Sequence, residues 1–194
     1  MQIKLEKLAI VLLGAGLSTR FGSEKLVSDF EGSLLLQRVL DNLGPSRILP
    51  KYLVVKTGFS LDKFDLRGFT PVLNPDYRSG ISSSIKAGLR RCDPDTEGIV
   101  LTLADMPFVH WKDVERLIAE ASSRREIVAF SHRGEKGFPT FLPCSIFPDI
   151  FSLEGENGAF SLVRTGKVSS KLIEGEKRHV QDIDIRDDIL DYSL

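Results

Sequence analysis

The sequence has few cysteines and no long hydrophobic run. Cys92 and Cys144 are the two cysteines among 194 residues, and they lack metal-ligand spacing, so we expect reduced thiols in a cytoplasmic protein. No apolar run approaches the roughly 18 residues that a membrane span needs. Residues 1–7 also lack the apolar core and the cleavage site of a signal peptide. These absences predict a protein without a membrane partner.

The sequence also lacks an excess of charge of either sign. Lysine and arginine total 26 against 27 acidic residues, so no overall charge favours nucleic acid, and any anion site must be local. The three histidines, His110, His132 and His179, stand in unrelated contexts. No Ser-His-Asp or Cys-His arrangement is evident, and we expect these histidines on the surface or in packing, although His132 in a polar loop could reach a ligand.

Apolar strands that alternate with amphipathic helices predict an α/β fold. The chain is long enough for one full core, so we expect residues 1–194 to form a single domain. Strands are predicted at 8–13, 51–57, 71–75, the run that ends before Asp105, 126–130 and 138–142, and helices at 33–43 (capped by Ser33), 80–91, 111–122, 146–151 and 157–163. This order predicts a mostly parallel sheet, which the strand at 138–142 makes mixed.

A glycine-rich loop with two cations follows the first strand. Gly14-Ala15-Gly16 lets the backbone turn sharply and brings N–H groups close to a ligand, while Arg20 and Lys25 add positive charge. A turn of this kind can also serve close strand-to-helix packing alone. The third glycine of a dinucleotide fingerprint would fall at Thr19 and the Gly-Lys pair of a P-loop at Phe21, so neither template fits. The loop favours an anion, above all a polyphosphate.

Two further features are expected at the same edge of the sheet. Asp105 follows a buried strand, and ligands of open parallel sheets bind beyond the carboxyl ends of the strands. Its alternative role is to cap the following helix. The helix that begins at Gly80 opens with small hydroxyl residues, and this end is a second potential anion cradle.

Four motifs, in this order along the chain, resemble the molybdenum cofactor nucleotidyltransferase family. LLGAGLSTRFGSEKL is similar to the family's nucleotide loop, NPDYRSGISSSIKAGL to a segment ending in Ser-Leu-x-x-Gly-Leu, and LADMP to its metal-binding strand end. GEKGFPTFLP and LEGENGAFSLV look like the Gly-His-Pro and Gly-Asp-x-Gly-Ala blocks of the cytidylyltransferase branch. Sugar-phosphate and methylerythritol cytidylyltransferases are more distant relatives. The resemblance implies a three-layer, Rossmann-like nucleotidyltransferase fold.

The resemblance also implies roles for individual residues. Asp105 would bind magnesium, Asp182 and Asp184 match a family Asp-Ile-Asp pattern, and Asp184 is the expected second metal ligand. Arg20, Lys25 and Asp105 would be catalytic. The expected nucleotide-binding residues are Leu13, Gly14, Ala15, Gly16, Ser18, Arg20, Lys25, Gly80 and Ser84.

The implied reaction is attack by a phosphate monoester on the α-phosphorus of a nucleoside triphosphate, with pyrophosphate leaving. Such a displacement needs positioning and charge neutralisation more than a covalent nucleophile. The expected substrates are CTP or GTP and molybdopterin, handled by a monomer or weak homo-oligomer. Three alternatives stay open: a GTP-dependent guanylyltransferase of the same cofactor, a sugar-phosphate nucleotidyltransferase, and a nucleotide-binding or cofactor-binding protein without turnover.

The sequence departs from the family on the acceptor side. Phe138 replaces the histidine of Gly-His-Pro, Glu156 replaces the aspartate of Gly-Asp-x-Gly-Ala, and Phe160 replaces the arginine that follows. These changes remove polar groups from the expected acceptor pocket. Gly14-Ala15-Gly16 falls between the Ala-Ala-Gly usual with cytidine and the Ala-Gly-Gly usual with guanosine, and the segment 83–89 favours CTP.

Overall fold

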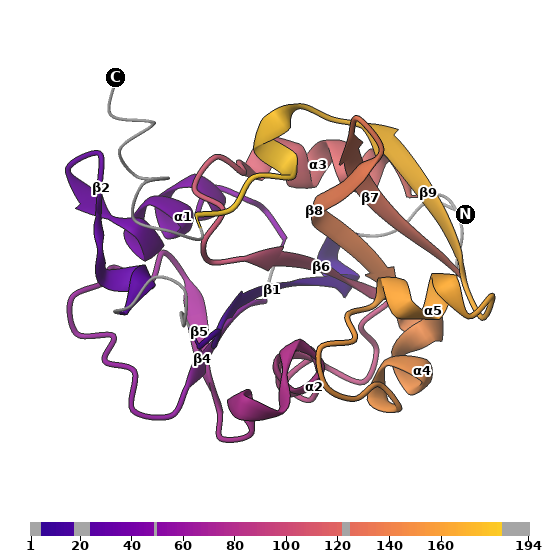
Figure 1. The fold of residues 1–194 in the computed structure, drawn as a ribbon, viewed down its shortest axis with the longest axis horizontal. Helices are drawn as coiled ribbons and strands as arrows, with labels where there is room; N and C mark the ends of the chain where they lie inside the picture. The colour runs from indigo at the N-terminus through magenta and orange to yellow at the C-terminus, as the bar shows by residue number, and fades with distance from the viewer. Residues whose placement is uncertain (1–4, 18–23, 49, 122–124, 184–194) are drawn as a thin grey trace.

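Nine strands and five α-helices make up the part of the chain that the computed structural model describes, residues 5–17, 24–48, 50–121 and 125–183 (Figure 1). The strands are β1 Leu8–Gly14, β2 Asp29–Phe30, β3 Ser33–Leu34, β4 Lys51–Lys56, β5 Phe69–Asn74, β6 Gly98–Leu103, β7 Glu126–His132, β8 Glu135–Pro143 and β9 Ser169–Glu174. The helices are α1 Leu35–Leu43, α2 Ile81–Leu89, α3 Trp111–Glu120, α4 Phe147–Phe151 and α5 Phe160–Arg164. No helix in these ranges is long and apolar enough to cross a membrane.

Seven of these strands form one mixed sheet in the order β5-β4-β1-β6-β8-β7-β9. β1 pairs in parallel with β4 and with β6, β4 with β5, and β7 with β9. β8 alone among the described strands of this sheet pairs antiparallel, with β6 on one side and β7 on the other. The prediction of a mostly parallel sheet made mixed by the strand near 138–142 is therefore confirmed.

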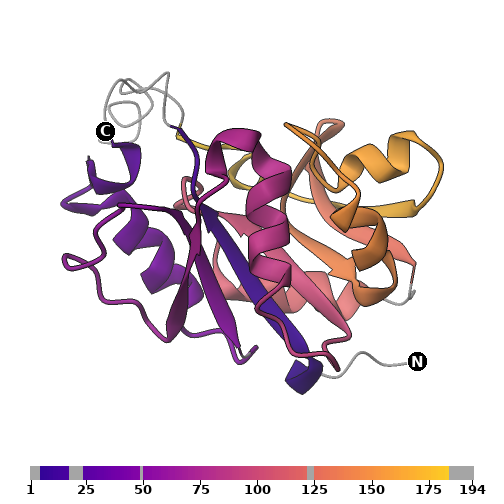
Figure 2. The ribbon, with the colours of Figure 1, turned by 90° about the horizontal axis from the view of Figure 1, so that it is seen from below.

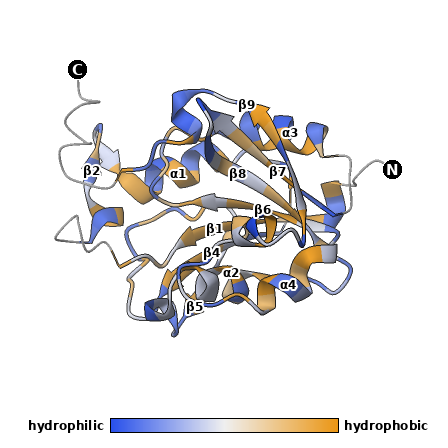
Figure 3. Ribbon diagram, turned by 45° about the vertical axis from the view of Figure 1, so that its right-hand side comes forward, coloured by the Kyte–Doolittle hydropathy of each residue, from blue (hydrophilic) through white to orange (hydrophobic). Residues whose placement is uncertain are grey.

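The sheet is buried on both faces, which explains the unbroken apolar run of β1. Leu8, Ile10 and Leu12 pack in the cluster that contains the apolar side of α1 and α3, whereas Ala9 and Val11 pack in the cluster that contains α2, α4 and α5. Successive residues of a strand point to opposite faces, so one strand serves both cores. The helices accordingly lie in two layers about the sheet (Figure 2), and the apolar residues concentrate on the strands and inward helix faces (Figure 3). The three-layer prediction is confirmed.

The predicted start of the first helix is wrong. Ser33 does not cap it, because Ser33 pairs with Phe30 in the small β2-β3 hairpin and α1 begins two residues later, without a side-chain cap. The hairpin turn contains Glu31 and Gly32, both in the left-handed region of the backbone. Sequence periodicity favoured an earlier helix start because the turn residues lack the usual Asn-Gly signature.

Strand β9 was not predicted. Only Ile173 of its six residues is buried, because β9 is the outer strand of the sheet and pairs with β7 alone. An edge strand of this kind has no apolar alternation that would separate it from a polar loop. The prediction that one domain spans residues 1–194 remains a prediction, since residues 1–4 and 184–194 lie outside the described ranges.

Candidate active site

A cleft of about 540 Å³ lies at the carboxyl edge of β1 and β6. It brings together most of the residues named from the sequence, and adds others that periodicity and motif spacing did not single out. Its lining residues are Leu13, Gly14, Ala15, Gly16, Leu17, Lys25, Leu26, Tyr77, Gly80, Ile81, Ser84, Leu103, Ala104, Asp105, Glu156 and Asp182.

The two glycines of the first loop provide space rather than a left-handed backbone. Neither Gly14 nor Gly16 has a positive φ. A Cβ at Gly14 would lie 3.2 Å from Leu26 Cδ1 and 3.3 Å from the Cβ of Ala104, whereas a Cβ at Gly16 would have no heavy atom of the described residues within 4 Å. Gly14 therefore permits close packing where β1 and β6 end. Gly16 has no side chain that would cover the backbone of the loop. The expectation that this loop brings its N–H groups close to a ligand stays a prediction.

Lys25 and Asp105 meet directly in the cleft. Lys25, at the start of the short 3-10 helix Lys25–Val27, is only 7% exposed, and its Nζ lies 2.8 Å from Asp105 Oδ2. The other carboxylate oxygen, Oδ1, is buried and has no hydrogen-bond partner among the described residues. A buried acceptor without a partner is unfavourable. The carboxylate of Asp105 is thus only half compensated by the protein itself.

Asp105 does not cap the helix that follows it. The residue before α3 is His110, and the backbone N–H of His110 donates to Asp113 Oδ2 at 2.9 Å. The carboxylate at the amino end of α3 is therefore Asp113, eight positions beyond Asp105. The alternative of a capping role for Asp105 is excluded, and its side chain belongs to the cleft.

The amino end of α2 is covered by the loop that precedes α5. Gly80 has φ +88°, and a Cβ there would lie 2.4 Å from the backbone of Gly155, so a side chain has neither the conformation nor the room. Ser82 N–H donates to the Gly155 carbonyl at 3.2 Å, and Ile81 N–H to Glu156 Oε2 at 3.4 Å. The prediction of an open anion cradle at this helix end is corrected, because the protein's own carboxylate is placed there.

Asn74 is a supporting residue that sequence reasoning missed. It is 2% exposed at the end of β5, and its Nδ2 donates to Ser83 Oγ at 2.9 Å and to Ser84 Oγ at 3.1 Å. Ser84 lines the cleft as predicted, with its hydroxyl held by this contact. The rule that flagged Asp105, a polar side chain at the carboxyl end of a strand, also applies to Asn74 and could have found it.

A second pocket of about 170 Å³ adjoins the cleft, because Ile81 and Glu156 line both. Phe138 and Phe160, which replace the family's polar residues, contribute aromatic surface to it. Arg164 also lines it, one helical turn after Phe160 and hence on the same face of α5. Phe160 stands where the family motif has an arginine, and Arg164, four positions later, brings an arginine to the same pocket. Motif spacing could not reveal Arg164.

Three of the predicted site residues cannot be placed. Ser18, Arg20 and Asp184 lie outside the described residues. Asp182, the first aspartate of the Asp-Ile-Asp pattern, lines the cleft, and the next residue, Ile183, donates its N–H to the Asp105 carbonyl at 2.9 Å. The described residues contain no group of three or more His, Cys, Asp or Glu side chains arranged to hold a metal ion.

Comparison with protein families identifies the family of proteins to which this chain belongs. A family model for the MobA-like NTP transferase domain matches residues 10–172. This range contains the glycine loop, Asp105 and the strands that line the two pockets. The chain belongs to this family. As a MobA-like NTP transferase it is a nucleotidyltransferase, and the family resemblance inferred from the four motifs is confirmed.

Individual relatives and solved structures are similar to this chain over most of its length. The chain is 26% identical over 171 residues to the purine catabolism protein PucB of Bacillus subtilis (strain 168), covering 82% of each chain. A Mycobacterium sp. strain JC1 homologue of the Mycobacterium tuberculosis protein Rv0371c superposes with a TM-score of 0.79 at 24% identity, over 97% of this chain and 96% of that one. The molybdopterin-guanine dinucleotide biosynthesis protein A of Archaeoglobus fulgidus gives 0.70 at 19% identity, over 94% and 95%. These structures confirm the nucleotidyltransferase fold.

Proposed function

We propose that this nucleotidyltransferase transfers a nucleoside monophosphate from CTP to a phosphate monoester, with molybdopterin as acceptor and pyrophosphate as the second product. The observation that carries the proposal is the half-compensated carboxylate of Asp105 beside the bare glycine loop. A triphosphate would supply negative charge to the backbone N–H groups of the glycine loop. Its counter-cation would supply the positive charge that the partnerless oxygen of Asp105 lacks. No covalent nucleophile is needed, because in-line displacement depends on positioning and charge.

The triphosphate half of the reaction is assigned to the first loop and Lys25. Gly16 leaves backbone N–H groups accessible, and Lys25 is held at the cleft by Asp105. A lysine ammonium has three donors, so Lys25 can keep its contact with Asp105 and donate to a phosphate oxygen as well. Ser18 and Arg20 keep their predicted phosphate-binding roles as part of this proposal. Together these groups offset the charge of the departing pyrophosphate.

Magnesium fits the residues present. Asp105 has an uncompensated oxygen, Asp182 lines the same cleft, and Asp184 is proposed as a further ligand. Magnesium is usually held by one or two carboxylates, with phosphate oxygens and water completing its shell. When bound, it neutralises charge on the triphosphate oxygens. A solved fold neighbour, Rv0371c of Mycobacterium tuberculosis, is described as a complex with manganese, which supports a divalent cation here.

The second pocket is proposed as the acceptor site. It adjoins the nucleotide cleft at Ile81 and Glu156, as transfer between two bound substrates requires. Phe138 and Phe160 offer flat apolar surface for a ring, and Arg164 supplies a planar cation suited to a phosphate. Lys136 Nζ lies 4.7 Å from the ring centroid of Phe160 and adds positive charge. A heteroaromatic phosphate monoester such as molybdopterin matches this combination.

The remaining assignments follow from the same site. CTP is preferred because of the segment 83–89, with GTP as the alternative. Gly80 and Ser84 border the base and ribose in this proposal. Free Cys92 and Cys144 agree with the reducing cytoplasm. We expect no nucleic acid or membrane partner, and a monomer or weak homo-oligomer.

The test is a pyrophosphate-release assay with CTP, GTP, ATP and UTP, with and without magnesium and molybdopterin. We expect release with CTP only when magnesium and molybdopterin are both supplied, and loss of release in Asp105→Ala. Release with a sugar phosphate in place of molybdopterin would identify a sugar-phosphate nucleotidyltransferase. Nucleotide binding without release under any pairing would reject the transfer reaction for these substrates.

A further inference from the structure

The segment that follows β9, residues 175–183, returns across the molecule to the nucleotide cleft (Figure 1). We refer to residues 175–183 as the strap. Its last described residues touch the site, because Asp182 lines the cleft and Ile183 N–H donates to the Asp105 carbonyl at 2.9 Å. Ile183 is fully buried in a cluster with Phe30 and Leu35. The strap therefore links the edge of the sheet to the backbone of Asp105, whose side chain lines the cleft.

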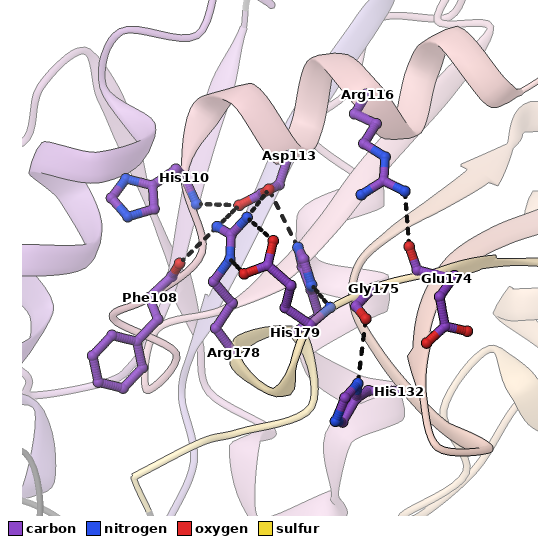
Figure 4. A network of polar contacts seen from close by, with 10 residues as sticks. Phe108, His110, Asp113, Arg116, His132, Glu174, Gly175, Arg178 and His179 are labelled. Carbon is purple, nitrogen blue, oxygen red and sulfur yellow. Dashed lines mark hydrogen bonds and ion pairs between the residues drawn. The ribbon is translucent and has the colours of Figure 1, made fainter.

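A bidentate ion pair fixes the middle of the strap to α3. Arg178 Nη1 lies 2.6 Å from Asp113 Oδ2, and Arg178 Nη2 lies 2.9 Å from Asp113 Oδ1 (Figure 4). Asp113 is 4% exposed, and Arg178 Nη1 also donates to the Phe108 carbonyl at 3.3 Å. Two parallel N–H to oxygen contacts fix direction as well as distance. Arg178 can therefore occupy only one orientation relative to α3.

His179 adds a second, fully buried contact to the same carboxylate. Its Nδ1 accepts the N–H of Glu176 at 2.8 Å, so in the neutral ring the proton is on Nε2, which lies 3.2 Å from Asp113 Oδ1. The ring also stacks on Phe130 of β7, with centroids 4.0 Å apart. Neighbouring strap residues thus converge on Asp113, and Figure 4 shows them arranged around it. We call Asp113, Arg178 and His179 the clasp.

Two glycines leave the space that the clasp occupies. A Cβ at Gly137 of β8 would lie 1.9 Å from the His179 carbonyl oxygen, and a Cβ at Gly175 would lie 2.8 Å from His179 Nδ1. Both neighbours are rigidly placed, since the ring is buried and stacked. Gly175 N–H donates to the Ser131 carbonyl at 2.8 Å, which attaches the start of the strap to β7. The backbone around Gly137 and Gly175 therefore leaves room for the strap in one position only.

The clasp also holds the strap electrostatically. Burial opposes ionisation of Asp113, but hydrogen bonds from His179 and from the His110 backbone, with the charge of Arg178, bring the pKa of its carboxyl below the ordinary value. The ionised form is therefore the one that the fold selects. An ionised, buried carboxylate keeps its partners in place, because withdrawing either one leaves an uncompensated charge.

The distance from the clasp to the cleft is short. Only residues 180 and 181 separate His179 from Asp182. Adjacent Cα atoms are about 3.8 Å apart, so a slip of the strap by one residue would carry a side chain out of coordination distance of a metal ion, which is about 2.1 Å for magnesium. The register of the strap therefore decides whether Asp182 faces the site.

We propose that Asp113, Arg178 and His179 are positioning residues for the transfer reaction: they set the register of the strap and so hold Asp182 beside Asp105 for the metal-triphosphate complex. This inference rests on the proposed function of the cleft. The clasp residues act through Asp182 and the Ile183 backbone contact, and they do not touch substrate.

The test compares Arg178→Ala and Arg178→Lys with Asp182→Asn and with Arg67→Ala as a matched control. Arg67 also pairs with two carboxylates, at 2.6 Å to Asp41 and 2.8 Å to Asp65, away from the strap. Two quantities are measured: hydrogen exchange at the Ile183 amide, and Mn²⁺ affinity in the presence of CTP. Wild-type KM and kcat are recorded as functions of metal concentration.

We expect Arg178→Ala to speed Ile183 exchange at least tenfold and to weaken Mn²⁺ affinity about tenfold. Arg178→Lys keeps the positive charge and loses the bidentate guanidinium contact, so it should show smaller changes in both Ile183 exchange and Mn²⁺ affinity. Asp182→Asn should weaken Mn²⁺ affinity and leave Ile183 protected, and combining it with Arg178→Ala should add little. Arg67→Ala should match wild type in both quantities.

Two results would overturn the inference. One is Mn²⁺ affinity in a folded Arg178→Ala or Arg178→Lys protein equal to that of wild type. The other is unchanged protection of Ile183 in those variants. A wild-type protein that binds neither CTP nor Mn²⁺ would instead reject the proposed function, and with it the role assigned to Asp182, so the two failures are distinguishable.

Discussion

Asp105 and Asp113 are two carboxylates of one short segment with opposite surroundings. Asp113 accepts three hydrogen bonds at 2.6 to 2.9 Å, two from Arg178 and one from the His110 backbone, and its Oδ1 lies 3.2 Å from His179 Nε2. Asp105 accepts one from Lys25, and its Oδ1 has no hydrogen-bond partner among the described residues. The satisfied carboxylate belongs to the first turn of α3, and the one with a partnerless oxygen lines the cleft.

The contrast separates a carboxylate that holds the structure in place from one that is available to a ligand. A buried carboxylate with all its acceptor capacity filled holds structure together, and removing it leaves its partners without compensation. A partly buried carboxylate that keeps one buried oxygen without a hydrogen-bond partner destabilises the free protein, and it is expected where a bound ligand supplies that partner. We therefore expect substitutions at the two positions to have different consequences, and each prediction below tests that difference.

The largest effect is expected from Asp105→Asn. This change removes the charge at the cleft while keeping the side-chain size, so turnover should fall by about 1,000-fold or more. Thermal stability should fall less than in Asp113→Ala, because the asparagine oxygen can still accept a hydrogen bond from Lys25 although the ion pair is lost. Pyrophosphate release and a melting curve measure the two quantities. A variant with near-normal turnover would contradict the assignment of Asp105 to the reaction.

The next effect is expected from Asp113→Ala, on stability. Removal of this carboxylate leaves Arg178 without its buried partner, and unfolding free energy should fall by about 3 kcal/mol. Urea denaturation measures the loss. Asp41→Ala is the control, since Asp41 pairs with Arg67 in a more exposed position and should lose less than about 1 kcal/mol. Equal losses in the two variants would show that the burial of Asp113 has no energetic significance.

A smaller effect is expected from Lys25→Met on nucleotide binding. The change removes one charge-assisted contact to a phosphate, so CTP affinity should weaken about tenfold. Lys56→Met is the control, because Lys56 forms its ion pair with Glu24 and does not line the cleft. Calorimetric titration with CTP measures both variants. Unchanged affinity in Lys25→Met would mean that Lys25 serves Asp105 alone.

The smallest effect is expected in the pH dependence of stability. The pKa of Asp113 is lowered in the folded protein, so its contribution is present above about pH 4, the unfolded value, and is lost as pH falls through the folded value. The stability difference between wild type and Asp113→Asn should therefore narrow on acidification below pH 4. Urea midpoints across that range measure it. A difference that widens there would contradict the direction of the pKa shift.

The sequence predicts the cleft well where the signal is local. The glycine loop directly follows β1 and Asp105 follows β6, and the rule that ligands bind beyond the carboxyl ends of strands predicted that the two lie at the same edge of the sheet. Hydrophobic periodicity likewise placed α1 and α3, apart from the first turn of α1. These features depend on residues within about ten positions of one another.

The parts that the sequence did not predict depend on contacts between distant segments. Asp113 and Arg178 are 65 positions apart, and each reads alone as an ordinary surface charge. Asn74 reaches the first turns of α2 from the end of β5, and Glu156 reaches its amino end from the loop before α5. β9 is polar along most of its length and is defined by its pairing with β7. No local pattern contains that information.

The place of Asp182 in the cleft has a consequence for biosynthesis. The first lining residue, Leu13, is made early, whereas Asp182 is translated 169 residues later. At about 5 to 20 residues per second, the interval is roughly 10 to 30 seconds. A nascent chain can assemble β1, β4 and β6 during that time, yet its cleft still lacks one wall. In the proposed function, we therefore expect nucleotide binding to begin only after translation has reached the strap, because Asp182 is part of the cleft lining.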